Sequence, residues 1–357
     1  MRSTRFPYFV YITLLLLISF KLFQTPKYNW DMLPYMAVLF NYDEVDVGKA
    51  HQQVYAQAKQ EVPVEAYKWL IDTSNLHRKR ALHETHFFSS LYPMYVVKPF
   101  YTRTCWLLYK MGVSLPVTTY FVSIIFYFLT GVLLLYWVSR YFKPVVSAVL
   151  SSVIMIMPFM MEAACLSTPD MCSALLVLTA MFFLVERKQF GTAGCFFIVS
   201  IFARIDNVIP ATIFLTGYQI LSQEHLSWKK YFLILSGVIA SFLYVSSLAS
   251  RYGFSWMYAD SYINKMRSSD TITQVNMTDA RFILSQISSG IRHSSFAVFI
   301  VIGLFLLLFL KRKKQLNWVL FAIGICVLIR FLLQPVIADR FFIPYYLLII
   351  VIVLMKM

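Results

Sequence analysis

The chain has 357 residues, of which 59% are hydrophobic and 17% aromatic, and it carries a formal net charge of +15. Apolar runs near the roughly 20 residues that span a bilayer recur along it, and a soluble protein of this size does not need them. The composition therefore excludes a soluble globular enzyme and favours one membrane domain, residues 1–357. Lys and Arg accumulate in the cytoplasmic loops of membrane proteins, so the charge does not call for a nucleic-acid partner.

The first predicted element is an apolar helix from Tyr8 to Phe23, preceded by Arg2 and Arg5. It lacks a small-residue cleavage site, which predicts a retained anchor rather than a signal peptide. Because basic residues stay on the cytoplasmic side, residues 25–112 should form a large first outer loop. Charged residues recur in this loop at helical intervals among Tyr, Val and Leu, which predicts amphipathic helices on the membrane surface.

Apolar segments beyond residue 112 alternate with polar turns and predict the remaining spans. Lys and Arg mark every second turn, so the positive-inside rule places both termini in the cytoplasm. A second long outer loop, residues 251–292, interrupts the series. The sequence thus predicts an all-α, polytopic membrane helix bundle of roughly ten transmembrane helices. The expected spans after the first are residues 116–141, 145–160, 171–185, 190–203, 209–221, 231–250, 296–310, 318–333 and 341–355.

The outward ends of these spans carry acids and arginines from segments far apart in the chain. Charges at membrane depth are costly and usually face a cavity with a partner or a function. Arginine suits a phosphate because its planar fork donates two hydrogen bonds, and a nearby acid can accept the proton of a hydroxyl group. We therefore predict a site for an anionic lipid headgroup and a reacting group. Its candidate residues are Asp31, Asp170, Arg204, Asp206, Arg330 and Arg340, together with Tyr35, His86 and Lys98.

Each candidate also has an ordinary structural explanation. Asp31 and Asp170 stand where helices are expected to begin, and Asp is a common N-cap residue. The acid and the arginine within residues 204–206, and those at 339–340, would serve equally as interfacial anchor pairs. The segment His83–His86 spaces two histidines by three residues but differs from the HExxH zinc motif, so it predicts no metal ligand.

Five short motifs, taken in order, resemble the GT-C superfamily of integral-membrane glycosyltransferases. The aminoarabinose transferases and the protein O-mannosyltransferases are its most similar members. Asp31, directly after the first span, resembles their catalytic acid, although Met32 stands where the family has a second acid. Thr168 replaces the arginine of another family motif. The other resembling stretches are Leu91–Tyr95, Ser167–Asp170, Ala203–Asn207 and Asp339–Pro344.

The resemblance implies an inverting glycosyltransferase that moves a sugar from a polyprenyl-phosphate donor to a glycolipid, glycan or protein acceptor. The reaction would take place on the outer face of a membrane, by default the bacterial inner membrane. Asp31 would accept the proton of the acceptor, and Arg204, Arg330 and Arg340 would bind the departing lipid phosphate. The family allows a divalent metal, and no other cofactor is implied.

Two other classes of protein remain compatible with the sequence. A transporter or flippase of a lipid-linked saccharide, or of another anionic solute, would also use intramembrane Arg and Asp, and it predicts repeat symmetry with charges near the middle of the bilayer. A non-catalytic assembly subunit predicts that Asp31 is dispensable.

Overall fold

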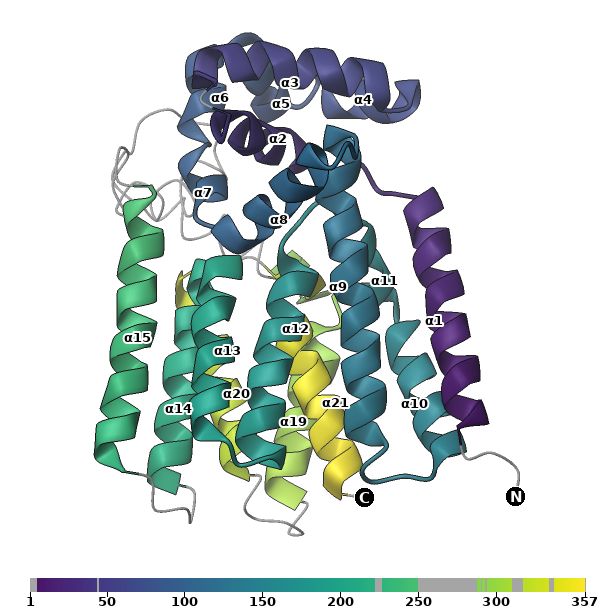
Figure 1. Ribbon diagram of the computed structural model, residues 1–357, viewed down its shortest axis with the longest axis vertical. Helices are drawn as coiled ribbons and strands as arrows, with labels where there is room; N and C mark the ends of the chain where they lie inside the picture. Colours follow the sequence, from purple (N-terminus) through teal and green to yellow (C-terminus); the bar gives the residue numbers. More distant parts are fainter. Residues whose placement is uncertain are drawn as a thin grey trace.

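The computed structural model describes residues 5–43, 45–221, 227–249, 288–289, 291–292, 294–309, 317–333 and 337–356. Every secondary-structure element in these ranges is a helix, which confirms the all-α class. Long helices form a bundle, and a layer of shorter helices lies across one end of it (Figure 1). Most of the predicted second outer loop, residues 251–292, lies outside the described residues.

The bundle helices begin and end within a few residues of the predicted spans. Three of the described helices, α1, α9 and α15, are long and apolar enough to cross a membrane, and the bent pair α10–α11 makes a fourth. Because several others are shorter, the set of ten spans stays a prediction. The bounds are α1 Phe6–Gln24, α9 Leu115–Val138, α10 Pro144–Met155, α11 Pro158–Cys165, α12 Asp170–Met181, α13 Phe190–Ala203, α14 Val208–Leu221, α15 Trp228–Ser247, α19 Phe296–Phe309, α20 Asn317–Leu333 and α21 Ile343–Lys356.

The span predicted over residues 145–160 is wrong as a single helix, because α10 and α11 meet at an angle of 61°. Pro158 occupies the first turn of α11, where its missing N–H costs nothing. A proline also disfavours helical geometry in the residue before it, and Met157 is accordingly extended, with φ −57° and ψ 139°. The break turns Met157 and Phe159 toward α19 and α21, where they line an apolar groove.

The layer across the end of the bundle, which we call the cap, contains helices α2 to α8 (Figure 1). Its innermost helix, α2, is apolar along most of its length and is buried from Met32 to Leu39. The outer helix α3 is amphipathic and starts at Asp46, whose side chain accepts a hydrogen bond from the N–H of Gly48. The bounds are α2 Met32–Asn41, α3 Val47–Glu61, α4 Val64–Leu70, α5 Leu76–His83, α6 Thr85–Ser90, α7 Pro93–Val96 and α8 Pro99–Lys110.

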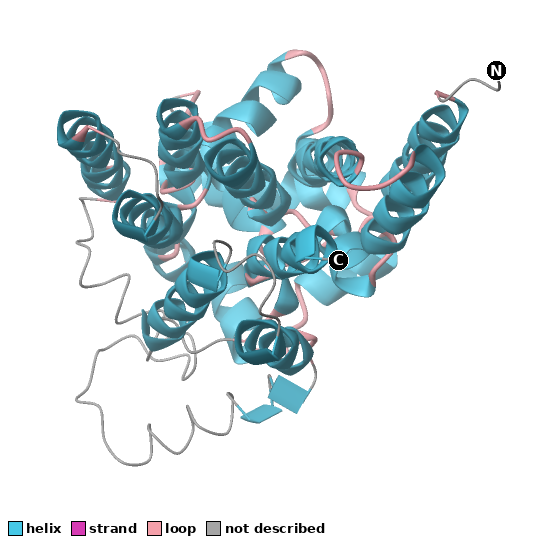
Figure 2. Ribbon diagram, turned by 90° about the horizontal axis from the view of Figure 1, so that it is seen from below, coloured by secondary structure: helices cyan, strands magenta, loops and turns pink. Residues whose placement is uncertain are grey.

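The direction of the bundle helices brings the polar breaks together beneath the cap. The start of α1 and the end of α21 lie at the opposite end of the bundle (Figure 1). Seen end-on, α21 lies in the middle of the bundle (Figure 2), and most of its side chains are buried. The short helices η2, Ile205–Asn207, and η5, Asp339–Phe341, precede α14 and α21 and therefore lie at the cap end.

Candidate active site

Five separate stretches of chain contribute to one continuous series of ion pairs beneath the cap. Asp31 Oδ2 accepts a hydrogen bond from Arg340 Nη1 at 3.0 Å. The Nε atom of Arg340 lies 3.8 Å from Asp170 Oδ2, and the other oxygen of Asp170 accepts a hydrogen bond from Arg204. These contacts join the entry to α2, the start of α12, the break after α13 and the helix η5.

The series continues from Arg204 to the end of α20. Both oxygens of Asp206 accept hydrogen bonds from Arg204, through Nε and Nη2, at 3.0 Å each. Asp206 also pairs with Arg330, which lies in the last turn of α20. We call these six residues the ion-pair chain: three aspartates and three arginines, with a formal charge of zero. All six were predicted site residues, and the structure brings them together.

The ordinary structural explanations apply to only some of these residues. Asp31 occupies the N-cap position of α2, but its side chain makes no capping hydrogen bond. Asp170 is the first residue of α12, directly after the N-cap residue Pro169. Asp339 does not pair with its neighbour Arg340: it accepts hydrogen bonds from the N–H of Ser295 and the hydroxyl of Tyr346. Arg204 and Asp206 do pair with each other, as the anchor explanation predicted. The helix starts therefore present both acids to arginines rather than to their own backbone.

Two polar side chains besides Arg340 hold the carboxylate of Asp31. The hydroxyl of Tyr95 donates to Oδ1 at 2.8 Å, and the amide of Asn29 donates to Oδ2 at 3.1 Å. Burial, and then the nearby charge of Asp31, raise the pKa of Tyr95, so this phenol stays a hydrogen-bond donor. Neither residue was predicted as a site residue, although Tyr95 ends the Leu91–Tyr95 motif that could have identified it.

One aromatic ring, that of Phe341, lies at the centre of the three arginines. The guanidinium carbons of Arg204, Arg330 and Arg340 lie 5.0, 4.9 and 5.0 Å from its centroid. The face of an aromatic ring attracts cations, so Phe341 stabilises three like charges around one point. Sequence reasoning missed this role, because an apolar residue next to an arginine gives no sign that other arginines approach it.

The ion-pair chain is most deeply buried at Asp170 and Arg330, and it opens into a cavity at Asp31 and Arg340. The side chain of Asp170 is 2% exposed and that of Arg330 is 7% exposed, whereas those of Asp31 and Arg340 are 21% and 24% exposed. Burial works to lower the pKa of Arg340, but the charges of Asp31 and Asp170 raise it overall. The cavity has a volume of about 290 Å³, and its lining includes Trp30, Asp31, Asn75, His77, Arg78, Met94, Tyr95 and Arg340.

The three other predicted site residues lie farther from the carboxylate of Asp31. The buried ring of Tyr35 packs edge-to-face against Tyr95, with ring centroids 4.8 Å apart. The Nζ atom of Lys98 lies 4.8 Å from the ring of Tyr95 and donates to the carbonyl oxygen of Met94 at 2.7 Å. Tyr35 and Lys98 thus contact the ring of Tyr95, the residue whose hydroxyl binds Asp31. His86 is exposed on α6, and the structure does not bring it to the ion-pair chain.

A metal site would need several ligands close together. Within the described ranges, no group of three or more His, Cys, Asp or Glu residues is arranged to hold an ion. Each aspartate of the ion-pair chain is instead paired with an arginine.

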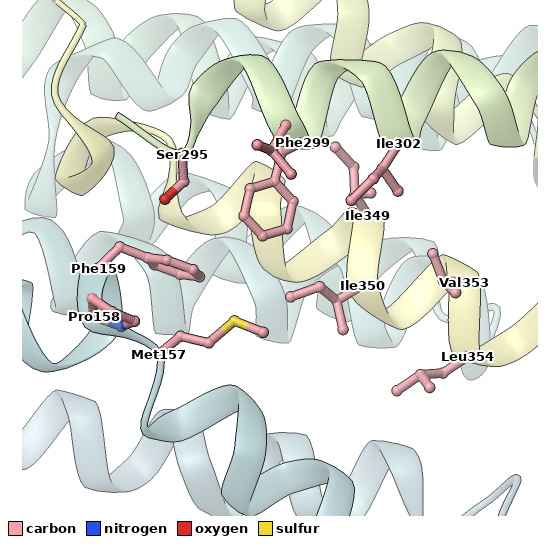
Figure 3. Close-up of a pocket in the computed structure, with 11 residues that line it drawn as sticks. Met157, Pro158, Phe159, Ser295, Phe299, Ile302, Ile349, Ile350, Val353 and Leu354 are labelled. Carbon is pink, nitrogen blue, oxygen red and sulfur yellow. The ribbon is translucent and has the colours of Figure 1, made fainter. Parts of the chain in front are cut away.

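An apolar groove of about 490 Å³ runs along α21 from the region of η5 (Figure 3). The rings of Phe159 and Phe299, which both line it, pack edge-to-face with centroids 5.7 Å apart. Ser295 marks one end of the groove, and its N–H donates to Asp339, the residue before Arg340. Val353 and Leu354 line the other end. The groove thus leads from the neighbourhood of the ion-pair chain into the apolar part of the bundle.

Comparison with known proteins does not identify this arrangement. No family model matches the chain, and neither the curated proteins nor the solved structures contain a match.

Proposed function

We propose that this chain is a membrane-embedded, inverting glycosyltransferase that moves a sugar from a polyprenyl-phosphate donor to an acceptor on the cap side of the membrane. The observation that supports this proposal best is the pairing of Asp31 with Arg340 on the wall of one cavity. A carboxylate can accept the proton of an attacking hydroxyl group, and a guanidinium can bind a leaving phosphate. The cap side would then be the outer face.

Bond formation and bond cleavage balance in such a step. The acceptor oxygen attacks the anomeric carbon of the donor from the face opposite the phosphate, and Asp31 takes the hydroxyl proton. The bond between that carbon and the phosphate oxygen breaks, and the lipid phosphate departs with the electron pair. Arg340 stabilises the negative charge that develops on this oxygen, and the other two arginines of the ion-pair chain add positive charge nearby.

The contact between Asp31 and Arg340 must loosen for this chemistry to proceed, because an arginine lowers the basicity of a neighbouring carboxylate. A donor phosphate competes with Asp31 for the same guanidinium. Within the part of the chain that the structure describes, the buried Oδ2 atom of Asp170 has no hydrogen-bond partner, and it lies 3.8 Å from Arg340 Nε. A small movement of Arg340 toward the phosphate and Asp170 would leave Asp31 a stronger base once the donor is bound.

The apolar groove along α21 offers a place for the lipid chain of the donor. Its lining is almost entirely apolar, and one end lies at Ser295, close to η5 (Figure 3). An isoprenoid chain in the groove would be removed from water while its phosphate reached the arginines. This arrangement supports a lipid-linked donor over a water-soluble nucleotide sugar.

The proposal is tested by transfer of labelled sugar from polyprenyl-phosphate donors in membrane vesicles, with wild type and Asp31→Asn at matched expression. Loss of a general base costs about 10²–10⁴-fold in rate, so we expect at least a 100-fold fall, with donor binding retained. Asp43→Asn is the matched control, because this acid of the cap pairs with Lys110 and Trp106 and does not line the cavity. Equal turnover in the wild type and Asp31→Asn would refute the assignment of Asp31.

A further inference from the structure

The cavity at Asp31 has a second charged wall, formed by the cap rather than by the bundle. Asn75, His77 and Arg78 line it from the start of α5. The ring of His77 packs edge-to-face against Trp30, with centroids 4.8 Å apart, so α5 lies directly against the entry to α2. Whatever fills the cavity contacts this wall and the carboxylate of Asp31 together.

Arg78 is the unusual member of this wall. Its Nη1 atom donates to the carbonyl oxygen of Trp69 at 2.6 Å, and its guanidinium carbon lies 3.7 Å from the centroid of the Trp69 ring. Those contacts use one of its five N–H donors. Among the residues that the structure describes, no carboxylate forms an ion pair with Arg78, whereas Arg340 pairs with Asp31. Asp72 attracts Arg78 only at longer range, so the cap wall brings to the cavity a guanidinium that no described carboxylate contacts directly.

From these observations we infer that the cavity binds an acceptor sugar carrying an anionic group, either a carboxylate or a phosphate, and that Arg78 binds that group. The inference rests on the proposed function, since it names the class of acceptor. The donor phosphate has its own arginines in the ion-pair chain, so Arg78 is not needed for it. A cavity of about 290 Å³ is at the small end of ligand sites, which suits one sugar unit.

Because both residues line the same cavity, Arg78 would select the acceptor and Asp31 would activate it. A guanidinium binds a carboxylate or phosphate through two parallel hydrogen bonds, which fixes orientation as well as position. An anionic group held at Arg78 turns the rest of the sugar toward the wall that contains Asp31, where a hydroxyl group meets the base. A neutral sugar would lack this anchor and would bind in several orientations.

The alternative is that Arg78 only fastens α5 to α4 through Trp69. Direct binding measurements on the full chain in nanodiscs, without any donor, distinguish this structural role from anion binding. The probes are methyl glucuronoside, glucose 6-phosphate and the neutral methyl glucoside. The variants are Arg78→Gln, Arg78→Lys and the matched control Lys79→Gln, which removes an exposed charge from the next position of the same helix. Thermal unfolding of each variant reports the structural role.

We expect at least one anionic sugar to bind wild type about tenfold or more tightly than the neutral sugar, as a charge-assisted pair would give. Arg78→Gln should abolish this preference and, through the lost contacts with Trp69, lower the melting temperature by only about 2–3 °C. Arg78→Lys should keep part of the preference, and Lys79→Gln should keep all of it. Preference for glucuronoside or for the sugar phosphate tells which anion is recognised. Equal binding of neutral and anionic sugars, no binding of either anionic sugar, or retention of the preference in Arg78→Gln would overturn the inference.

Because no donor is present, these results are independent of the transfer assay. Anion-selective binding with no sugar transfer would refute the proposed glycosyltransferase while leaving an anion site at Arg78. Transfer that depends on Asp31, with no anion preference, would refute only the acceptor class.

Discussion

The replacement Asp206→Asn tests whether the equal number of positive and negative charges in the ion-pair chain stabilises the folded protein. Asp206 pairs with both Arg204 and Arg330, whose side chains are 11% and 7% exposed. Its removal leaves two buried guanidinium groups facing a neutral amide. Removing one member of a buried ion pair costs about 3–5 kcal/mol. Since Asp206 is 27% exposed and Asn keeps one acceptor oxygen, we expect the lower end, about 3 kcal/mol.

Thermal unfolding of the purified chain in nanodiscs measures this cost. An unfolding entropy of about 2.1 cal/mol/K per residue over 357 residues converts 3 kcal/mol into a fall of about 4 °C in Tm. The control is Glu65→Gln, which breaks an exposed pair with Lys68. Exposed pairs contribute about 0–1 kcal/mol, so the control should change Tm by about 1 °C or less.

A second substitution restores the balance and decides between two explanations. The double variant Asp206→Asn/Arg330→Gln retains two aspartates and two arginines in the ion-pair chain. If charge balance is the cause, the double variant should recover at least half of the loss in Tm. Strictly additive losses would show that individual hydrogen bonds, and not the balance of charge, hold the chain together.

Three further predictions concern residues around the ion-pair chain and the cap. Tyr95→Phe removes one hydrogen bond from the carboxylate of Asp31, about 1 kcal/mol, so the acidic limb of the kcat/KM profile should move to higher pH; an unchanged profile would contradict this. Phe341→Leu removes three cation–π contacts of about 0.5–1 kcal/mol each and should lower Tm by about 2–4 °C, whereas Phe341→Tyr should not. Burial acts to raise the pKa of Asp43, but hydrogen bonds from Lys110 and Trp106 lower it overall. The stabilisation that Asp43 gives the folded protein is therefore present above its unfolded pKa of about 3.9 and is lost as pH falls through its folded pKa. Between about pH 5 and pH 3, the Tm of Asp43→Asn should therefore fall less than the Tm of wild type.

The charged residues of the site could be predicted from the sequence because each interrupts or ends an apolar segment. Asp31, Asp170 and Arg204 stand at such places, and a charge there is costly unless it has a partner. The pairing between them could not be predicted. Which acid meets which arginine depends on how helices far apart in sequence pack, and hydrophobic periodicity does not encode that arrangement. Arg340 reaches Asp31 across 309 residues of sequence.

Other features of the site carried weaker signals. Pro158 was visible in the sequence and could have predicted the break between α10 and α11, because a proline commonly ends or kinks a helix. Phe341 and Tyr95 had no such signal beyond their motifs, since aromatic residues are common at the ends of membrane spans. The role of Arg78 depends on the folding of the cap over the bundle. Residues 77–80 are all basic, and the sequence does not reveal which of these side chains faces a cavity.

The contact between Asp31 and Arg340 also has a consequence for biosynthesis. At about 5–20 residues per second, the ribosome adds Arg340 about 15–60 s after Asp31. Tyr95 follows Asp31 by only 64 positions and would be the early partner of its carboxylate. A chain that stops before Arg330 holds three aspartates and one arginine where the finished protein has three of each. We therefore expect cells to degrade such unfinished chains rapidly, since unpaired charges beneath the cap would prevent its stable closure.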